Sequence, residues 1–401
     1  MGGAVNLNFF DPAVIADPIP HYDELRALGS VVRNDLFGAW MVAGHHHALE
    51  VLKNPAMFSS VGIAQMATDR VNAFGGAPTM LFADPPDHER LRGVVQQAFT
   101  PRAIAQLEPR VREIVDELLG PVHEGESLDI MERLAYPLPV IVIAEMLGVP
   151  AADRPLFKEW SDALVNGMSE TAGMDDQSRS RDAGEELRAY FGREIAARRI
   201  TPQEDLVTRM VHANEVEGTL SDAELLASCV LLLVAGNETT TKFIGNMALY
   251  LAEHPEVRAR LAADFTKAPR AFEEMVRLVG PVQATVRVAR GDTQIGNTPV
   301  AAGEMVFVML AAANRDPSVF VDPTRADLDR WPNPHLGFGH GIHFCIGATT
   351  ARLESRIAFE RLLQIAPDYE IEVGHEALHY APSFFLRGLE RLPVKMTRRV
   401  A

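Results

Sequence analysis

One ten-residue stretch of this chain reads Phe338-Gly339-His340-Gly341-Ile342-His343-Phe344-Cys345-Ile346-Gly347. It contains one of only two cysteines in 401 residues, and three glycines surround that cysteine. Because glycine permits positive φ and close backbone approach, we expect the loop to wrap tightly around whatever contacts the sulfur. After Gly347, apolar residues recur at helical spacing, which predicts that Cys345 lies just before a helix N-terminus. The helix dipole and the unpaired N–H groups there favour a thiolate, the form that binds metal.

A lone cysteine beside a glycine-rich turn can also be a buried structural residue, since free cysteines are commonly buried. The complete pattern decides between the two interpretations. The stretch resembles the haem-binding loop of the cytochrome P450 family, Phe-Gly-x-Gly-x-His/Arg-x-Cys-x-Gly, at every fixed position. The resemblance implies haem b (iron protoporphyrin IX) with Cys345 as the proximal iron ligand. It also implies that Phe338, Gly339 and Gly347 contact the haem.

Composition excludes several other classes of protein. The formal net charge of −16, without a long basic run, argues against nucleic-acid binding. Cys229 and Cys345 are too far apart in sequence for a Cys-x-x-Cys metal site, and two cysteines give no disulfide framework. We find no signal peptide, and the most apolar run, at 225–236, is shorter than the ~20 residues that a membrane helix needs. We therefore expect a cytoplasmic protein without a membrane anchor.

A long helix is predicted between a capping box at Ser221-Asp-Ala-Glu224 and the stop signal His254-Pro255. Its length, roughly 50 Å at 1.5 Å per residue, is unusual for a globular protein. Near its middle stands Ala235-Gly236-Asn237-Glu238-Thr239-Thr240-Thr241, where a buried helix would prefer leucine or alanine. Such a departure from helix propensity indicates a site. The alternative is a helix bent by Gly and Thr with Glu238 in a salt bridge.

The same segment is similar to the P450 pattern Ala-Gly-x-Asp/Glu-Thr-Thr. In the family this acid–alcohol pair delivers the protons that oxygen activation consumes in a pocket that otherwise excludes water. The resemblance implies that Glu238 and Thr239 are catalytic. It also implies that Ala235 and Gly236 lie against the haem.

Further positions are candidate ligands of the haem propionates. His88 and Arg92 follow Asp84-Pro-Pro at i, i+4 on one predicted helix face, where they could clamp an anion or simply face solvent. In the P450 family a similar His-x-x-x-Arg pair binds a propionate. Arg287, in a strand-like segment at 284–289, resembles the second propionate ligand, and His343 resembles a third donor.

Glu274 and Arg277 form an i, i+3 pair of a kind found on many helices. The pair resembles the structural Glu-x-x-Arg of the P450 family, which a later Arg in a Pro-x-Arg-Phe segment completes. Here that segment is assigned to Pro323-Thr-Arg325-Ala326, with Ala326 in place of the aromatic residue. Arg325 is therefore the predicted third partner, and such a network fixes geometry more than it adds stability.

The predicted substrate pocket is apolar and of moderate size. The long connection at 59–83 is a candidate substrate loop, the polar stretch at 169–180 is predicted to interrupt the helices, and 384–386 resembles an apolar hairpin tip. Arg70 and Gln283 are candidates for hydrogen bonds to a polar end of the substrate. The predicted lining residues are Val61, Ile63, Met66, Phe74, Met80, Leu81, Leu232, Ala235, Val282, Ala284, Val286 and Phe385.

The resemblance covers nearly the whole chain and implies a mainly α (α+β) fold, a single P450 domain over 1–401. The haem would lie between the helix at 221–254 and the Cys345 loop, and small β-sheets would include a hairpin at 30–43. The implied activity is monooxygenation with O₂, by hydroxylation or oxidative dealkylation of a small-to-medium apolar substrate.

Electrons would come from a separate ferredoxin-type partner with an NAD(P)H-dependent reductase. A candidate basic patch for that partner comprises Arg102, Arg110, Arg112, Arg352 and Arg356. Two alternatives remain: an H₂O₂-dependent peroxygenase of the same fold, which typically lacks the acid–alcohol pair, and a thiolate-haem gas or ligand sensor, which usually carries an output domain.

Overall fold

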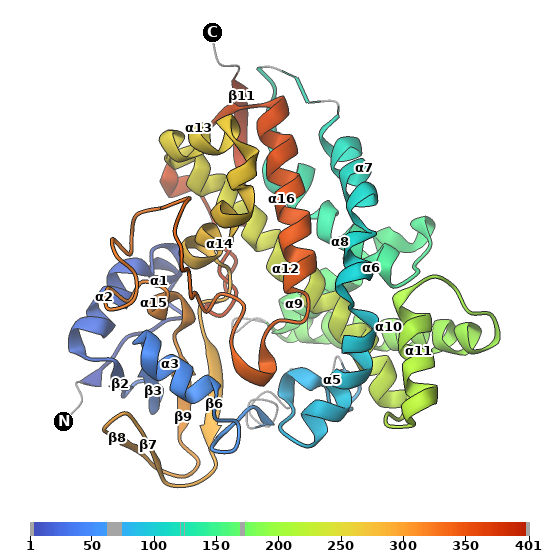
Figure 1. The fold of residues 1–401 in the computed structure, drawn as a ribbon, viewed down its shortest axis with the longest axis horizontal. Coiled ribbons are helices and arrows are strands. Elements are labelled where there is room, and N and C mark those ends of the chain that lie inside the picture. Colours follow the sequence, from blue (N-terminus) through green and yellow to red (C-terminus); the bar gives the residue numbers. More distant parts are fainter. Residues whose placement is uncertain (1–3, 62–73, 121, 124, 169–172, 398–401) are drawn as a thin grey trace. The chain divides into compact units, whose positions relative to one another are not determined.

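The computed structural model describes residues 4–61, 74–120, 122–123, 125–168 and 173–397 (Figure 1). The protein is 56% helical with small sheets, which confirms the predicted fold class. The chain divides into two compact units. The first comprises residues 1–57, 108–138 and 239–401, and the second comprises 58–107 and 139–238. The single domain over 1–401 stays a prediction.

The largest sheet of the first unit contains β1 (Ala4–Val5), β2 (Val31–Asn34), β3 (Ala39–Val42), β9 (Met305–Val308) and β6 (Thr285–Ala289), in that order. Strands β2 and β3 pair antiparallel with Val31 opposite Val42, so the predicted hairpin at 30–43 is confirmed. Strand β6 pairs antiparallel with β9, and Val286 lies opposite Phe307. The predicted strand around Arg287 is therefore confirmed as well.

Two smaller sheets complete the strands of the first unit. One contains β10 (Asp368–Ile371), β11 (Pro393–Thr397) and β5 (Ser127–Asp129), and the other is the hairpin of β7 (Thr293–Ile295) and β8 (Thr298–Val300). The helices of this unit are α1 (Pro12–Ala16), α2 (Ile19–Leu28), α3 (His45–Leu52), α7 (Glu108–Leu119), α13 (Pro255–Ala263), α14 (Ala268–Val279), α15 (Leu310–Ala313) and α16 (Ala348–Ile365).

Helix α16 packs against α7 and α14 (Figure 1). Apolar residues repeat along it at helical spacing, and Leu353, Ile357 and Leu362 are buried. Helix α14 buries Phe272 and Met275 together with two charged side chains, Glu274 and Arg277. Charged groups are seldom buried without partners, so this helix marks a structural network.

The second unit is built from helices. Its elements are β4 (Phe58–Ser59), α5 (Asp87–Ala98), α6 (Pro101–Ala105), α8 (Pro137–Met146, nearly all in this unit), α9 (Arg154–Met168), α10 (Met174–Ile200) and α11 (Leu206–Glu217). Helices α9 and α10 pack through aromatic rings, with the Phe157 and Tyr190 centroids 4.9 Å apart in an edge-to-face arrangement. The expected interruption at 169–180 is wrong at its C-terminal end, because α10 already begins at Met174. Acidic Asp175 and Asp176 occupy the first turn of α10 and favour a helix start.

Helix α12 runs from Asp222 to Glu253 and confirms the predicted long helix. Its capping box forms as expected: Ser221 N–H donates to the Glu224 carboxylate at 2.8 Å, and Glu224 N–H donates to Ser221 Oγ at 3.3 Å. By length and composition it is the one helix among the described residues that could cross a membrane, but 67% of its most apolar window is buried. Such burial is typical of a core helix.

Candidate active site

The Cys345 loop adopts a conformation that its glycines make possible. Gly339 and Gly341 have φ of +70° and +71°, and a Cβ added to Gly341 would lie 2.5 Å from the Leu52 carbonyl oxygen. Only glycine fits there. The Cys345 N–H donates to the Phe338 carbonyl oxygen at 2.9 Å, which closes the loop. Helix α16 begins three residues after Cys345, so the predicted position of the thiol before a helix N-terminus is confirmed.

The two cysteines lie in opposite surroundings. Cys345 is exposed, whereas Cys229 on α12 is fully buried. Burial raises the pKa of the Cys229 thiol to about 12 and keeps it protonated. Since ligands must be thiolates, Cys345 is the metal-ligand candidate and Cys229 is a core residue.

The acid–alcohol segment begins where the buried run 227–234 of α12 ends. Residues 227–234 are all buried, but Ala235 is exposed, and Glu238 and Thr239 are partly accessible. The helix runs unbroken through this segment. The glycine at 236 allows close packing on its other side, because a Cβ there would lie 3.2 Å from the Ile143 side chain. The segment thus places an accessible acid and an accessible hydroxyl directly after the buried run 227–234.

A neighbouring contact was not anticipated from the sequence. The Asn237 side chain donates to Ser161 Oγ at 2.8 Å, and both residues are buried. This bond ties α12 to α9 within the second unit, next to the acid–alcohol pair. A buried amide inside a helix motif was the available signal, because such a group needs a partner.

The predicted pair His88 and Arg92 lies on α5, one turn apart, as expected. His88 is 2% exposed, and burial together with the charge of Arg92 lowers its pKa. A neutral imidazole can donate one N–H without carrying a charge into the interior. The Asp84 carboxylate accepts from Ser59 Oγ at 2.5 Å and from Ser60 N–H at 2.8 Å, and so holds the two ends of the 59–83 connection together.

The other predicted propionate ligands lie in the first unit. Arg287 is 6% exposed, and its guanidinium donates to Thr285 Oγ1 at 3.1 Å and to the Val286 carbonyl at 2.7 Å. His343 is half-buried at the end of the short 3₁₀ turn Gly341–His343. Their binding of a propionate stays a prediction.

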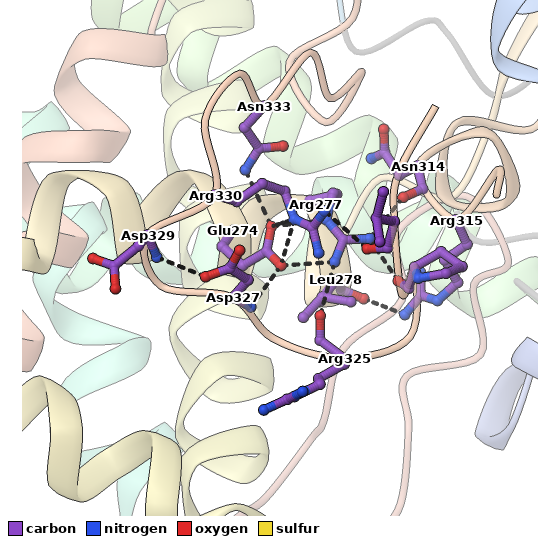
Figure 2. Close-up of polar contacts among 12 residues, drawn as sticks. Glu274, Arg277, Leu278, Asn314, Arg315, Arg325, Asp327, Asp329, Arg330 and Asn333 are labelled. Carbon is purple, nitrogen blue, oxygen red and sulfur yellow. Dashed lines mark hydrogen bonds and ion pairs between the residues drawn. The ribbon is translucent and has the colours of Figure 1, made fainter. Parts of the chain in front are cut away.

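The structural network around Glu274 forms with one correction (Figure 2). Arg277 forks onto the Glu274 carboxylate at 2.7 and 2.8 Å, and both side chains are fully buried. The second guanidinium on this carboxylate belongs to Arg330, whose Nε lies 3.0 Å from both oxygens. Arg325 contributes its backbone carbonyl oxygen, which accepts from Arg277 at 3.3 Å. The prediction of Arg325 as third charged partner is therefore wrong.

The predicted pocket residues of the second unit are divided between surface and interior. Val61 and Leu81 are 37% and 48% exposed, although both are apolar. The others that the structure describes there, besides Ala235, are buried, namely Phe74, Met80 and Leu232. Ile63, Met66 and Arg70 lie outside the described residues.

In the first unit, Val286 is buried, Val282 is half-buried and Phe385 stacks on Phe307 with centroids 5.9 Å apart. Ala284 belongs to a buried apolar cluster that also contains Tyr22 and Phe384. Gln283 does not offer a polar anchor, because it accepts from Tyr22 Oη at 2.8 Å and donates to two backbone carbonyls. The Gln283 amide is instead fully used in hydrogen bonds inside the core.

The expected basic patch is balanced by acids. In the first unit its four arginines pair with five glutamates. The arginines are Arg110, Arg112, Arg352 and Arg356, and the glutamates are Glu108, Glu113, Glu117, Glu273 and Glu360. These residues give no local excess of positive charge. Arg102 lies exposed on α6 in the second unit.

The donor set fits a thiolate-ligated haem. The accessible thiol precedes a helix N-terminus, on a loop whose glycines keep its backbone compact. Among the described residues there is no cluster of three or more His, Cys, Asp or Glu side chains that could hold a metal ion. Cys345 would therefore be the iron's protein ligand, with Arg287 and His343 as candidate donors to the propionates. These features are the ones expected of a thiolate-haem protein.

Comparison with known proteins gives the family. A family model described as Cytochrome P450 matches residues 180–373. Cytochrome P450 109 of Bacillus spizizenii is 41% identical over 384 residues, covering 95% of this chain and 92% of that protein. The vitamin D(3) 25-hydroxylase of Pseudonocardia autotrophica is 37% identical over 405 residues, covering 100% and 98%. The crystal structure of CYP109E1 from Bacillus megaterium in complex with testosterone has a TM-score of 0.86 at 35% identity, covering 96% and 100%.

The chain belongs to the cytochrome P450 family. It has the P450 fold, its cofactor is haem b, and it is a P450 monooxygenase.

Proposed function

We propose that this monooxygenase hydroxylates or oxidatively dealkylates an apolar organic substrate, with electrons from a separate ferredoxin-type protein and its NAD(P)H-dependent reductase. The observation that carries the proposal is the accessible pair Glu238 and Thr239, which follows the buried run 227–234 of α12. A peroxygenase does not need this pair, because H₂O₂ brings its own protons. A sensor does not need proton delivery at all.

The two side chains divide the proton transfer between them. When bound, the haem supplies the redox chemistry that activates O₂. In this proposal the Thr239 hydroxyl would relay protons, and the Glu238 carboxyl group would supply them.

An apolar substrate of steroid-like size is supported by two observations. Val61 and Leu81 lie near the two ends of the candidate substrate loop at 59–83, and both expose apolar side chains. One relative is named a vitamin D(3) 25-hydroxylase, and one similar structure holds testosterone. We also propose a cytoplasmic location, because two cysteines far apart in sequence give no disulfide framework and fit a reducing compartment.

The docking face for the ferredoxin does not follow from an excess of arginines. Arg112 and Arg356 share Glu108 and Glu360, so their charges are balanced. We propose that the partner contacts Arg102 of the second unit, for which the described residues show no ion pair. Reversing the charge of Arg102 should then slow reduction, while reversing Arg110 should change it little.

Replacing Thr239 tests the proton-delivery role. Thr239→Ala should lower product formed per NAD(P)H consumed by at least about tenfold and release the lost electrons as H₂O₂. Thr239→Ser keeps the hydroxyl and should restore most of the coupling, and Thr240→Val is the matched control for loss of a neighbouring buried hydroxyl. Unchanged coupling in Thr239→Ala, together with full turnover on H₂O₂ alone, would favour the peroxygenase.

A spectral screen tests the substrate class. Steroids and secosteroids should convert the ferric haem from low to high spin at lower concentration than fatty acids of equal carbon number. A stronger response to the fatty acids would contradict the steroid-like class and leave the monooxygenase assignment intact.

A further inference from the structure

An ion pair between Glu273 on α14 and Arg352 on α16 lies next to Phe338, the first residue of the Cys345 loop. Arg352 donates to the Glu273 carboxylate through Nε at 2.6 Å and through Nη2 at 2.9 Å. The two side chains are 36% and 27% exposed. A forked guanidinium–carboxylate pair fixes orientation as well as distance. This pair is therefore more rigid than an ordinary surface contact.

Arg352 also contacts the loop itself. Its guanidinium carbon lies 4.4 Å from the centroid of the Phe338 ring, which is a cation–π distance. The carbonyl oxygen of Phe338 accepts the Cys345 N–H at 2.9 Å. One side chain thus connects the carboxylate on α14 to the residue that closes the loop around the thiol.

The Glu273 carboxylate also contacts the segment that precedes the loop. His335 Nε2 lies 2.9 Å from Glu273 Oε2, and Gly337 N–H donates to His335 Nδ1 at 3.2 Å. Because Nδ1 accepts, Nε2 carries the proton and donates to Glu273. Burial opposes ionisation of Glu273, but Arg352 and His335 outweigh it and lower its pKa to about 2. Glu273 is therefore an anion at neutral pH.

We propose that Glu273 and Arg352 are positioning residues that hold the Phe338–Cys345 loop and set the reduction potential of the iron bound by Cys345. Reduction adds one negative charge next to the loop. A nearby cation favours that charge and a nearby anion opposes it. The two partners therefore act on the potential with opposite signs, although both support the same loop.

The adjacent pair on α16 provides a matched control. Arg356 lies one turn after Arg352 and pairs with Glu108 and Glu360 at 3.0 Å each. Neither of those glutamates contacts the Cys345 loop in any recorded hydrogen bond or ion pair among the described residues. Neutralising Arg356 changes the charge of the same helix without releasing Phe338.

The test is the one-electron reduction potential of the purified holoenzymes. Glu273→Gln should raise the reduction equilibrium constant about three- to tenfold, and Arg352→Gln should lower it by a similar factor; tenfold corresponds to 59 mV for one electron. The double variant should return near the wild-type potential. Arg356→Gln should shift the constant less than about twofold, because the described contacts of Arg356 are to Glu108 and Glu360 and not to the Cys345 loop.

A purely structural role makes a different prediction. Loosening the loop from either side would shift both single variants in the same direction and would weaken the red-shifted thiolate band of the ferrous–CO complex equally. Shifts of the same sign, or shifts no larger than that of Arg356→Gln, overturn the proposal. If Arg352→Gln fails to retain haem, Glu273→Gln alone must still raise the potential, and Arg352→Lys must keep it within about twofold of wild type.

Discussion

Two buried carboxylates on neighbouring helices of the first unit have opposite surroundings. Glu274 on α14 is fully buried and accepts hydrogen bonds from Arg277 and Arg330, from Asn333 Nδ2 at 3.1 Å, and from the Asp327 N–H at 2.9 Å. Burial alone would raise its pKa, but the hydrogen bonds and charge of Arg277 outweigh burial and lower it. Glu274 is thus an anion in the protein core.

Glu354 on α16 is nearly as buried, at 3% exposed. Among the described residues, its Oε2 accepts no hydrogen bond. Burial raises its pKa to about 8, so it is mostly protonated at neutral pH. The comparison teaches that hydrogen-bond donors, and not depth, decide whether a buried carboxylate in this fold is charged. Glu273 is 27% exposed and forked by Arg352, and it is an anion like Glu274.

The largest effect is expected when the anion at position 274 is removed. Glu274→Ala leaves Arg277 and Arg330 buried without a counter-charge and should cost about 3–5 kcal/mol of stability. We expect low holoenzyme yield and a lower denaturant midpoint in urea unfolding followed by circular dichroism. A loss below about 1 kcal/mol would mean that the network is not fixed in solution.

The second prediction concerns Glu354 and pH. Its folded-state pKa lies above the unfolded value, so stability is fully present below about pH 4.5 and is lost as pH rises toward about 8. The steepest loss approaches about 1.4 kcal/mol per pH unit. Glu354→Gln should therefore match wild type near pH 5 and exceed it increasingly up to pH 8 in urea unfolding. A pH-independent difference would contradict a neutral, donor-poor Glu354.

The third prediction separates Arg330 from Arg325. Arg330→Gln removes a charged donor from the buried carboxylate and should cost about 2 kcal/mol. Arg325→Gln is the matched control: only its backbone carbonyl contacts the network, and the change should stay within about 0.5 kcal/mol. Thermal unfolding of the two holoenzymes side by side is the measurement. Equal losses would restore Arg325 to the network.

The smallest expected stability effect is at Glu273. Because its pair with Arg352 is partly solvated, Glu273→Gln should cost about 1 kcal/mol or less. The same denaturant series as for Glu274→Ala checks this value. A loss as large as that at Glu274 would place Glu273 in the structural network and not in the thiolate support.

Local chemistry made much of the fold predictable. The capping box at Ser221 and the apolar spacing after Gly347 predicted the starts of α12 and α16, because caps and periodicity act within a few residues. These features depend on neighbours in the sequence.

The predictions for Arg325 and Gln283 were wrong because segments without regular secondary structure bring their partners together. Arg330 reaches Glu274 across 56 residues, along a segment without regular secondary structure between 314 and 340. Trp331 follows Arg330, so an arginine with an aromatic neighbour was present in the sequence five residues downstream of Arg325-Ala326. Gln283 was misread because its partner, Tyr22, is 261 residues away. Contacts at such separations follow from packing and not from local pattern.

The most direct test of the whole account is the CO difference spectrum of the reduced protein and of Cys345→Ala. We expect a red-shifted thiolate band for the wild type and loss of that band in Cys345→Ala. The control variant Cys229→Ala should retain the band. A folded, haem-loaded wild type without the band, or a Cys345→Ala variant that keeps it, would contradict ligation of the iron by Cys345.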